Sequence, residues 1–518
     1  TCTVSTVRRG PMSSICARSR TLPGGITESF SVGSAPRRRG KPLWGRRSGG
    51  SRSGGDSLVE PQGGLGLTES GANPKARFPG RAVVLGASMA GLAVASVLAR
   101  NFDAVLVVDK DAPAESPQPR RGVPQGTHVH GLQPHALTLL ERFLPGVSSS
   151  LIDAGAVSID FGANIRAYMA DGWVPNKPAG RQALSLTRPF LEHYIRLHAA
   201  DIANLDFAWE HRVLKLSGSD AGVTGVVCEK EGTETQIDAA LVVDATGRGT
   251  RAGSWLEELG FGGLEISSVY IDVRYVTCNY TRPPDDLRGV IVRHYPHCKL
   301  GAALLPVEND QWLLSLSGRF GVYARKDPAG FMASAAELPI ADVHELLVDR
   351  PATTPVTAYN FAHNEVRHYA TLPRLPAGFV ALGDSVLALN PLYGQGMTAS
   401  LAQAELLGDT LAGLLDQGAP APSAIGEAFI PRQAEFVAEP WRRALIGDTI
   451  FTEARGDLPA DLDAIRARDA ALTALAAEDV EVARLVARVT QFATPAAALE
   501  RSDIAERVEA KLAQASSA

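Results

Sequence analysis

Residues 83–92 read VVLGASMAGL, an apolar run that leads into a turn holding two glycines and a serine. Gly86 lets the chain turn sharply from a strand into a helix, and Gly91 lets that helix pack closely on the strand. Ser88 stands at the middle position of the G-x-G-x-x-G fingerprint of dinucleotide sites, where a small residue allows the backbone to approach a pyrophosphate. Because the N–H groups that begin such a helix attract phosphate, the stretch predicts a nucleotide site.

A second apolar run, residues 104–108, follows this turn and ends in Asp109, 18 residues after Gly91. An acid at about this distance binds the ribose hydroxyls of a dinucleotide. Residues 82–99 carry no charge and are long enough for a short membrane helix. The glycines and the second run instead favour a strand–helix–strand unit whose strands are buried in a parallel sheet. On its own, this pattern fits NAD as well as FAD.

Length and composition limit the class of protein. The chain of 518 residues can hold two or three domains, and its 45% hydrophobic and 21% charged residues are ordinary for a globular protein. A net charge of −5 argues against nucleic acid as the main partner. The five cysteines include no pair with C-x-x-C spacing, so we expect a reduced, cytoplasmic protein.

The first 78 residues differ in composition from the rest of the chain. They include SAPRRRGKPLWGRRSGGSRSGGD, which is rich in Arg, Ser and Gly and poor in acidic residues. Such a segment cannot bury enough apolar surface to become ordered, so we expect residues 1–78 to be a disordered extension. Such a composition is also typical of an organelle transit peptide. The first residue, Thr1 rather than Met, favours an extension without a targeting role or an upstream translation of a misassigned start.

Two further stretches combine strand ends with polar residues. Residues 120–132, RRGVPQGTHVHGL, contain His128 and His130, but the sequence offers no third ligand nearby, so we expect no metal. Residues 241–260, LVVDATGRGTRAGSWLEELG, run from an apolar strand ending in Asp244 through a glycine-containing turn into a helix.

A last stretch, residues 378–411, again has a strand that ends in an acidic residue, followed by a loop and a helix. It reads GFVALGDSVLALNPLYGQGMTASLAQAELLGDTL, a strand that runs to Asp384 and then a loop. A helix is predicted to start after Gly396, and its N-terminus can hold a phosphate or the polar edge of a ring.

In this order, GASMAG, DATGRGTR and GDSVLALNPLYGQGM resemble the motifs of the FAD-dependent aromatic-hydroxylase-like monooxygenases. The chain is similar in particular to an actinobacterial branch that includes the polyether-ionophore epoxidases. That branch carries R-x-G-V-P-Q-x-x-H-x-H, placed here at Arg121 to His130, and G-D-x-x-x-x-x-N-P-x-Y-G-x-G-M, placed here at Gly383 to Met397.

The resemblance implies where FAD would bind. The glycine motif and Asp109 would hold its ADP part, Arg188 would reach a phosphate, and Asp384 would bind ribityl or ribose oxygens. The turn at residues 394–397 would lie against the flavin ring. The full set of implied cofactor residues is Gly86, Ser88, Gly91, Asp109, Arg121, Arg188, Asp244, Gly383, Asp384, Gly394, Gly396 and Met397.

The resemblance also implies an activity. The protein would be an epoxidase or hydroxylase that inserts one oxygen atom from O2 into an apolar substrate, such as one of antibiotic biosynthesis, by way of a C4a-hydroperoxyflavin. No catalytic triad is evident. His128, His130 and Tyr393 are candidates for the pocket lining, although such residues are more often simply packed or hydrogen-bonded. The family has Asp-Gly where this chain has Asp244 and Ala245. NAD(P)H would therefore supply electrons either directly or through a separate flavin reductase.

Two other activities fit a related fold. One is a flavin-dependent reductase or dehydrogenase of the geranylgeranyl-reductase type, and the other is a flavin halogenase. The halogenase alternative is disfavoured because the tryptophan pair of that family's motif is absent from the sequence.

The patterns together predict an α/β protein. A Rossmann-like FAD-binding domain is expected over residues 79–265 and 370–418, with an inserted antiparallel β-sheet substrate domain over 266–369. A helical region is expected over 419–518, where apolar residues recur at helical spacing, as in Ile504, Val508 and Leu512. This region would cap the fold, cover the pocket or form a dimer contact.

Overall fold

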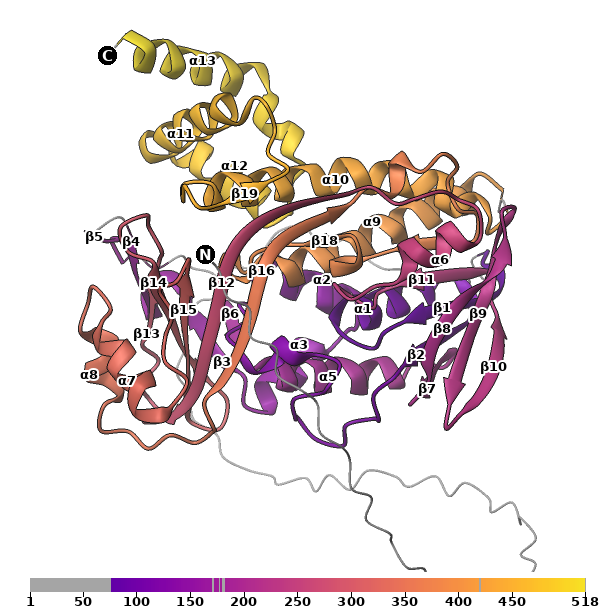
Figure 1. The fold of residues 1–518 in the computed structure, drawn as a ribbon, viewed down its shortest axis with the longest axis horizontal. Coiled ribbons are helices and arrows are strands. Elements are labelled where there is room, and N and C mark those ends of the chain that lie inside the picture. Colours follow the sequence, from indigo (N-terminus) through magenta and orange to yellow (C-terminus); the bar gives the residue numbers. More distant parts are fainter. Residues whose placement is uncertain (1–75, 170–171, 177, 179–181, 419–420, 518) are drawn as a thin grey trace, which may run out of the picture. The chain divides into compact units, whose positions relative to one another are not determined.

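The computed structural model describes residues 76–169, 172–176, 178, 182–418 and 421–517 (Figure 1). In this part of the chain, five parallel strands form one sheet in the order β17-β11-β1-β2-β7. Their bounds are β1 (Phe78–Leu85), β2 (Phe102–Asp109), β7 (Leu205–Trp209), β11 (Leu241–Asp244) and β17 (Phe379–Ala381). Leu85 lies opposite Asp244 in the register, so the predicted strand ends meet at one edge of the sheet.

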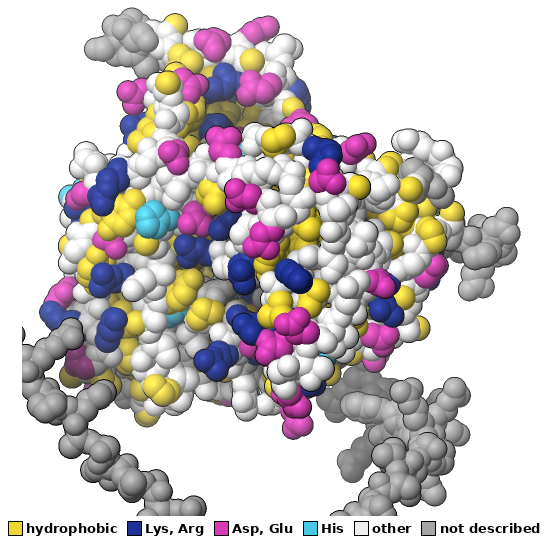
Figure 2. Space-filling model, turned by 45° about the vertical axis from the view of Figure 1, so that its right-hand side comes forward, with side chains coloured by type: hydrophobic (Ala, Val, Ile, Leu, Met, Phe, Trp, Pro, Cys, Tyr) yellow, Lys and Arg dark blue, Asp and Glu magenta, His cyan; other side chains and the backbone are white. Residues whose placement is uncertain are grey.

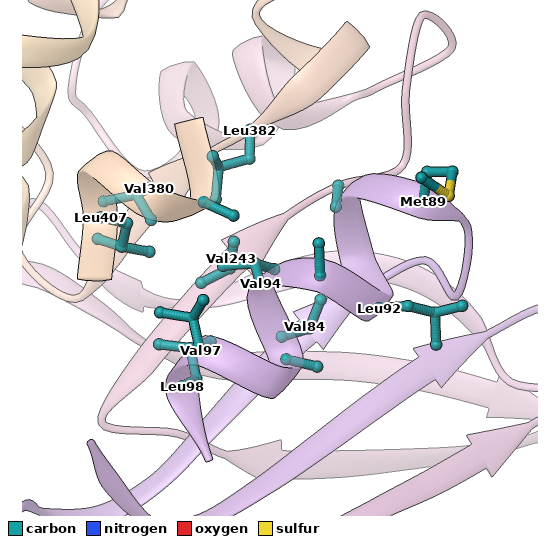
Figure 3. Close-up of a cluster of buried hydrophobic side chains, with 14 of the residues drawn as sticks. Val84, Met89, Leu92, Val94, Val97, Leu98, Val243, Val380, Leu382 and Leu407 are labelled. Carbon is teal, nitrogen blue, oxygen red and sulfur yellow. The ribbon is translucent and has the colours of Figure 1, made fainter. Parts of the chain in front are cut away.

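The strand–helix–strand unit around the glycine turn is confirmed. The helix α1 (Met89–Leu98) connects β1 to β2, and nearly all of its residues are buried. Figure 3 shows α1 side chains packed among Val84 of β1, Val243 of β11 and Val380 of β17. The uncharged run at 82–99 is therefore apolar because it is enclosed by the sheet and by other helices. Among the described residues, no helix is both long enough and apolar enough to span a bilayer.

The predicted boundary of the N-terminal extension is wrong at its last residue. Phe78 opens β1, is fully buried and stacks on Phe102 with ring centroids 5.3 Å apart. Its N–H also donates to the carbonyl of Asn101. Residues 1–75, on which most of this expectation falls, lie outside the described residues.

Two truncations test where the folded unit begins. Removing residues 1–75 is expected to leave the melting temperature unchanged, because their composition offers little apolar surface to bury. Removing residues 1–78 takes away Phe78 as well and is expected to cost about 3–5 kcal/mol, the range for a buried phenylalanine lost to a cavity. Thermal unfolding of both truncated proteins gives the comparison, and equal melting temperatures would contradict the role of Phe78.

Further helices and strands accompany the parallel sheet. They are the helices α2 (Pro134–Phe143), α3 (Val147–Asp153), α4 (Phe161–Asn164), α5 (Arg188–Ala200), α6 (Ala252–Glu258) and α9 (Gly396–Asp416), the strand pair β3 (Val157–Asp160) and β6 (Gln182–Ser185), and the antiparallel β8 (Arg212–Ser219), β9 (Gly222–Lys230) and β10 (Thr233–Asp238). Short 3-10 turns occur at η1 (Pro124–Thr127), η2 (Tyr369–Thr371), η3 (Gly383–Ser385), η4 (Pro391–Tyr393) and η5 (Ala496–Glu500).

A second, larger sheet contains the predicted β-rich segment. Its order is β18-β16-β12-β15-β14-β13-β4-β5, with β19 paired to β12. The bounds are β4 (Ile165–Met169), β5 (Gly172–Trp173), β12 (Ile266–Thr281), β13 (Gly289–Val292), β14 (Leu300–Val307), β15 (Gln311–Arg319), β16 (Thr357–Arg367), β18 (Leu387–Ala388) and β19 (Arg455–Gly456).

This sheet takes strands from outside residues 266–369, which the sequence pattern did not predict. β4 runs parallel to β13 next to the edge strand β5, whereas the other pairs are antiparallel. A parallel pair needs a long connection, and more than 100 residues separate these two strands. On one face, Trp312, Leu314 and Leu316 pack in a core with α7 (Pro328–Ala336) and α8 (Asp342–Leu347).

The predicted helical C-terminal region is confirmed. It consists of α10 (Ala424–Asp448), α11 (Leu462–Glu478), α12 (Val480–Thr490) and α13 (Ser502–Ser517), together with the short strand β19. Ile504 and Val508 are buried in a separate apolar cluster, and Leu512 packs against it, as the helical spacing predicted.

Acidic and basic side chains are interspersed on the molecular face that Figure 2 shows. Apolar side chains lie singly or in small groups between them. A nucleic-acid-binding protein typically gathers its lysines and arginines on one face. On this face, the described residues do not present such a gathering.

Candidate functional site

The turn after β1 depends on two glycines. Gly86 has a φ of +98°, and a Cβ at this position would lie 2.7 Å from the carbonyl oxygen of Ala245. A Cβ on Gly91 would lie 1.8 Å from the carbonyl oxygen of Gly86. Both contacts are too short for any side chain. Gly91 therefore lets the start of α1 lie directly against the end of β1, and Gly86 lets the turn lie against the residue that follows β11. Ser88 is the N-cap of this helix, and its side chain makes no capping hydrogen bond.

A cleft opens beside this helix start and brings the sequence motifs together. Its lining comes from Ser88, Met89, Ala90, Gly122, Val123, Gln125, Val129, His130, Gly131, Arg188, Ala245, Thr246, Gly247, Arg248, Tyr359, Phe361, Asp384, Leu389, Pro391, Gly394, Gly396, Met397 and Ser400. Seven predicted site residues line the cleft: Ser88, His130, Arg188, Asp384, Gly394, Gly396 and Met397. The other predicted residues are absent from this lining: Gly86, Gly91, Asp109, Arg121, His128, Asp244, Gly383 and Tyr393.

Arg188 lies at the helix start, where a phosphate would bind. Its Nη2 donates to Ser88 Oγ at 3.0 Å, and its Nε donates to Glu192 Oε1 at 2.8 Å. Burial raises the pKa of Glu192, but the charges of Arg188 and then Arg120 lower it overall to about 2, so this carboxylate is ionised. Glu192 therefore fixes both arginines beside the N-terminus of α1.

Arg120, rather than Arg121, is the arginine that enters this network. Arg120 Nη2 donates to Glu192 Oε2 at 3.1 Å and to the carbonyl of Ala87 at 2.9 Å, and its Nη1 lies 3.4 Å from Asp109 Oδ2. Arg121 is exposed. The spacing R-x-G places the motif arginine two residues before Gly122, at Arg120, so correct register would have found it.

Asp109 stands at the predicted end of β2 and organises the turn. Its Oδ2 accepts from the N–H of Ala87 at 2.6 Å, and its Oδ1 accepts from the N–H of Asp111 at 2.8 Å. Together with the ion pair to Arg120, these hydrogen bonds give both oxygens of the Asp109 carboxylate partners within the protein.

Asp244 is turned away from the cleft. It is fully buried, and its carboxylate accepts from the N–H and hydroxyl of Thr246 and from the hydroxyl of Thr250. These bonds shape the turn at residues 245–248, whose residues do line the cleft. Asp244 thus supports the wall and is held away from direct contact with a ligand.

Asp384 follows β17 and faces the same cleft. Burial raises its pKa, against the positive charges of Arg188, Arg248 and Arg367. Its neighbour Gly383 has a φ of +62°, and a Cβ there would lie 2.8 Å from the Cβ of Ala90. This glycine therefore allows the loop of Asp384 to pack against the start of α1.

The turn before α9 completes the cleft. Asn390 accepts from the N–H of Leu392 at 3.1 Å, and Gly394 adopts a left-handed φ of +63°. Gly396 is the first residue of α9, so the unpaired N–H groups of this helix begin at the cleft.

The two histidines differ in their surroundings. His130 lines the cleft and donates through Nδ1 to the carbonyl of His128 at 2.8 Å, which leaves its Nε2 as an acceptor. Burial and then the charge of Arg188 lower its pKa to about 3. Burial lowers the pKa of His128 to about 4, and its Nδ1 lies 2.6 Å from the hydroxyl of Thr277. Among the described residues, no three His, Cys, Asp or Glu side chains are grouped as metal ligands would be.

A second cavity, of about 560 Å³, lies between the large sheet and the α9 turn. We call it the substrate cavity. Its apolar lining includes Phe161, Met169, Ile291, Leu305, Leu392 and Phe451, and its polar lining includes Tyr275, His294, Ser315, Ser317, Arg319 and Tyr393. Val129, Gly131, Pro391 and Gly394 line both the cleft and this cavity.

The C-terminal region contributes to the wall of the substrate cavity. Gly447, Ile450, Phe451 and Gln491 all belong to it, although the sequence pattern indicated only helices there. A Cβ on Gly447 would lie 2.3 Å from the hydroxyl of Tyr393, so this glycine lets α10 approach the predicted pocket tyrosine.

The geometry of the cleft fits FAD. The start of α1 carries Arg188 for a pyrophosphate, the two glycine contacts exclude side chains, and the start of a second helix, α9, also lines the cleft. Residues as far apart in the sequence as Ser88 and Met397 line the cleft. The lining therefore offers polar partners to an extended nucleotide along its length.

Known proteins resemble the chain over most of its described part. The model of the FAD binding domain family matches residues 81–423. Protein Rv3254 of Mycobacterium tuberculosis (strain ATCC 25618 / H37Rv) is 31% identical over an alignment of 358 residues, and the match covers 65% of this chain and 73% of that protein. Two solved structures share the fold. The p-nitrophenol 4-monooxygenase PnpA from Pseudomonas putida DLL-E4 has a TM-score of 0.56 at 19% identity, over 79% of this chain and 97% of its own. The flavin-dependent brominase Bmp2 has a TM-score of 0.53 at 14% identity, over 70% of this chain and 87% of its own.

The family match includes every motif that lines the cleft, so the chain belongs to the FAD binding domain family and is a flavin-dependent oxidoreductase.

Proposed function

We propose that the protein is a monooxygenase that transfers one oxygen atom from O2 to an apolar metabolite, by epoxidation or hydroxylation. The observation that carries this proposal is the shared wall between the nucleotide cleft and the substrate cavity. Val129, Gly131, Pro391 and Gly394 line both, so a flavin in the cleft and an apolar molecule in the cavity would be neighbours.

The chain's own residues would bind and orient the cofactor. Arg188 and the N-terminus of α1 would hold the pyrophosphate, Asp384 would accept hydrogen bonds from sugar or ribityl hydroxyls, and residues 394–397 would face the ring. When bound, FAD supplies the chemistry that activates O2.

The protein's part in the reaction would be positioning and exclusion of water. The substrate cavity has a mainly apolar lining on the large sheet, which favours an apolar molecule and disfavours solvent. His130 has a pKa of about 3 and is neutral near pH 7, so it would offer an acceptor nitrogen in the cleft and no positive charge.

NAD(P)H would be the electron source, either directly or through a reductase. The turn at residues 245–247 reads Ala-Thr-Gly and lines the cleft, where the resembled family has glycine directly after the aspartate. This departure from the family's motif favours a separate reductase as the electron source. The motifs at residues 120–130 and 383–397 favour the epoxidase branch among the resembled monooxygenases.

The test uses the full chain reconstituted with FAD. The protein is reduced under anaerobic conditions by NADPH alone or by NADPH with a flavin reductase, and it is then exposed to ¹⁸O2 with a panel of apolar alkenes and aromatics. We expect one ¹⁸O atom in a product and reduction that requires the reductase. Free FAD with the same reductant is the control for chemistry in solution.

Other results would point elsewhere. Saturation or desaturation of a carbon–carbon bond without ¹⁸O would place the protein among the reductases. Efficient reduction by NADPH alone would remove the need for a partner and leave the oxygenation proposal intact. Hydrogen peroxide as the sole oxygen product with every compound would count against oxygen transfer.

A further inference from the structure

The wall of the nucleotide cleft contains a half-buried arginine, Arg248, whose charge is not balanced by an ion pair. Among the described residues, no carboxylate pairs with it. Its Nη2 makes one long hydrogen bond, 3.5 Å, to the carbonyl oxygen of His363, and its Nη1 makes none within the described part of the chain. Unlike Nε of the same side chain, Nη1 is not buried. Arg248 therefore keeps an accessible charged donor.

The guanidinium group of Arg248 lies beside the cleft. Its carbon is 4.1 Å from the centroid of the Phe361 ring, and Phe361 also lines the cleft. Burial raises the pKa of Asp384, a third lining residue, and the charges of Arg188 and then Arg248 act against this rise. Stacking on one lining residue and acting electrostatically on another place the positive charge at the cleft wall.

Arg367 holds the backbone that carries Arg248 and Asp384. Its Nη2 donates to the carbonyl oxygen of Arg248 at 3.0 Å, and its Nη1 donates to the carbonyl oxygen of Asp384 at 3.3 Å. The charge of Arg367 is itself balanced by Glu365, whose Oε2 lies 3.1 Å from Nη2. The turn after β11 and the turn after β17 are therefore tied together, and Arg248 extends from a fixed position.

The start of α1 has no positive side-chain charge to spare. Ion pairs of 2.8–3.4 Å connect five charged side chains there, namely Arg120, Arg188, Asp109, Asp111 and Glu192. Two positive and three negative charges leave this group at −1. The N-terminus of a helix offers roughly half a positive charge, which does not offset this deficit and a phosphate as well. A phosphate bound in the cleft therefore needs a further cation.

We propose that Arg248 binds a phosphate group of the nucleotide in the cleft, together with Arg188. Nη1 of Arg188 is likewise unpaired within the described residues and not buried, so both arginines of the lining present an open donor. A guanidinium group suits this role because its planar N–H groups match the oxygens of a phosphate.

Two nucleotides could supply this phosphate, FAD and a nicotinamide dinucleotide. The family of the chain makes the pyrophosphate of FAD the expected partner. The inference adds a phosphate-binding residue to the cleft and does not depend on oxygen transfer.

Equilibrium dialysis of the flavin-free full chain against FAD and against riboflavin tests the proposal. Riboflavin has the ring and the ribityl chain of FAD but no phosphate. Arg248→Met is expected to weaken FAD binding roughly ten- to a hundredfold, the range for a lost hydrogen bond to a charged group, and to leave riboflavin binding unchanged. Arg248→Lys keeps the charge without the planar fork, so FAD binding should weaken less than in Arg248→Met.

Arg251→Met is the matched control. Arg251 is an exposed arginine three residues further along the chain, and its guanidinium carbon lies 5.6 Å from the ring centroid of Trp255 rather than in the cleft lining. FAD binding should be unchanged in this variant. Thermal unfolding of the flavin-free variants checks folding, and we expect Arg248→Met to keep the melting temperature of the unaltered protein because its removal breaks no ion pair between described residues.

Titration of the FAD-saturated proteins with NADP⁺ separates the two sources. Unchanged FAD binding with a loss of NADP⁺ binding in Arg248→Met alone would retain the phosphate contact and assign it to the nicotinamide dinucleotide. Equal weakening of FAD and riboflavin would mean that Arg248 acts on the ring or through Asp384, and it would overturn the proposal. Unchanged binding of both FAD and NADP⁺ would overturn it too. An Arg248-dependent FAD affinity without ¹⁸O transfer would refute the proposed function and leave this inference standing.

Discussion

A Gly91→Ala variant is expected to lose FAD binding. The new Cβ would lie 1.8 Å from the carbonyl oxygen of Gly86, and the obstacle is backbone, which cannot rotate away like a flexible side chain. The helix α1 would have to move off the strand that positions it, and overpacking of this kind costs about 1–3 kcal/mol or more. Because the same helix start is the phosphate site, the displacement acts directly on the cofactor.

The matched control is Gly413→Ala, which also adds a methyl group to a helical glycine. A Cβ at Gly413 has no atom within 4 Å in the described structure, and this glycine lies inside α9. The control should bind FAD normally and gain about 0.5–1 kcal/mol from the higher helix propensity of alanine. Flavin content after reconstitution measures FAD binding, and unfolding followed by circular dichroism measures stability. Normal flavin content in Gly91→Ala would contradict the turn geometry.

Asp448→Ala is expected to be among the most destabilising single substitutions in the chain. It would leave the guanidinium of Arg319 buried beside no counter-charge and would remove the acceptor for Asn390, Asn364 and Tyr393. Breaking a buried ion pair from one side costs about 3–5 kcal/mol. Because Asn390 and Tyr393 flank the turn at the cleft, flavin retention should fall together with stability.

The exposed pair of Arg166 and Asp342 provides the comparison. Asp342 is about one third exposed and Arg166 about half, and Asp342→Ala is expected to cost less than about 1 kcal/mol. Urea unfolding of both variants measures the difference. In Asp448→Asn the side chain keeps its shape and one acceptor oxygen, so stability should lie between the wild type and Asp448→Ala. A loss below about 1 kcal/mol in Asp448→Ala would mean that the buried cluster tolerates an unpaired arginine.

Much of the nucleotide cleft could be predicted from the sequence because its determinants are local. A few residues of sequence are enough to recognise the glycine turn, the strand ending in Asp109 and the helix beginning at Gly396. Parallel strands place their carboxyl ends at one edge of a sheet, so three such turns converge there whatever their distance along the chain. Arg188 was predicted through resemblance alone, and it does lie at the helix start.

The substrate cavity depends on partners that no local pattern connects. Arg319 and Asp448 are 129 residues apart, and each looks like an ordinary charged residue until the fold buries both. Glu192 was likewise missed, although its i, i+4 spacing from Arg188 on one helix is a signal that sequence reasoning can use. The helical pattern of the C-terminal region could not reveal that Phe451 would become part of a cavity wall.

The order of the strands has a consequence for synthesis on the ribosome. β1 emerges early, but its sheet also requires β17, and β12 of the second sheet also pairs with β19 at residues 455–456. Chain synthesis proceeds at roughly 5–20 residues per second, so residues 394–397 are made on the order of 15–60 seconds after the glycine turn at residue 86. During this interval the nascent chain carries an incomplete nucleotide cleft with exposed apolar strands. The flavin can bind only after residues 394–397 have been made, and chaperones that shield β1 and β2 until then should raise the yield of holoprotein.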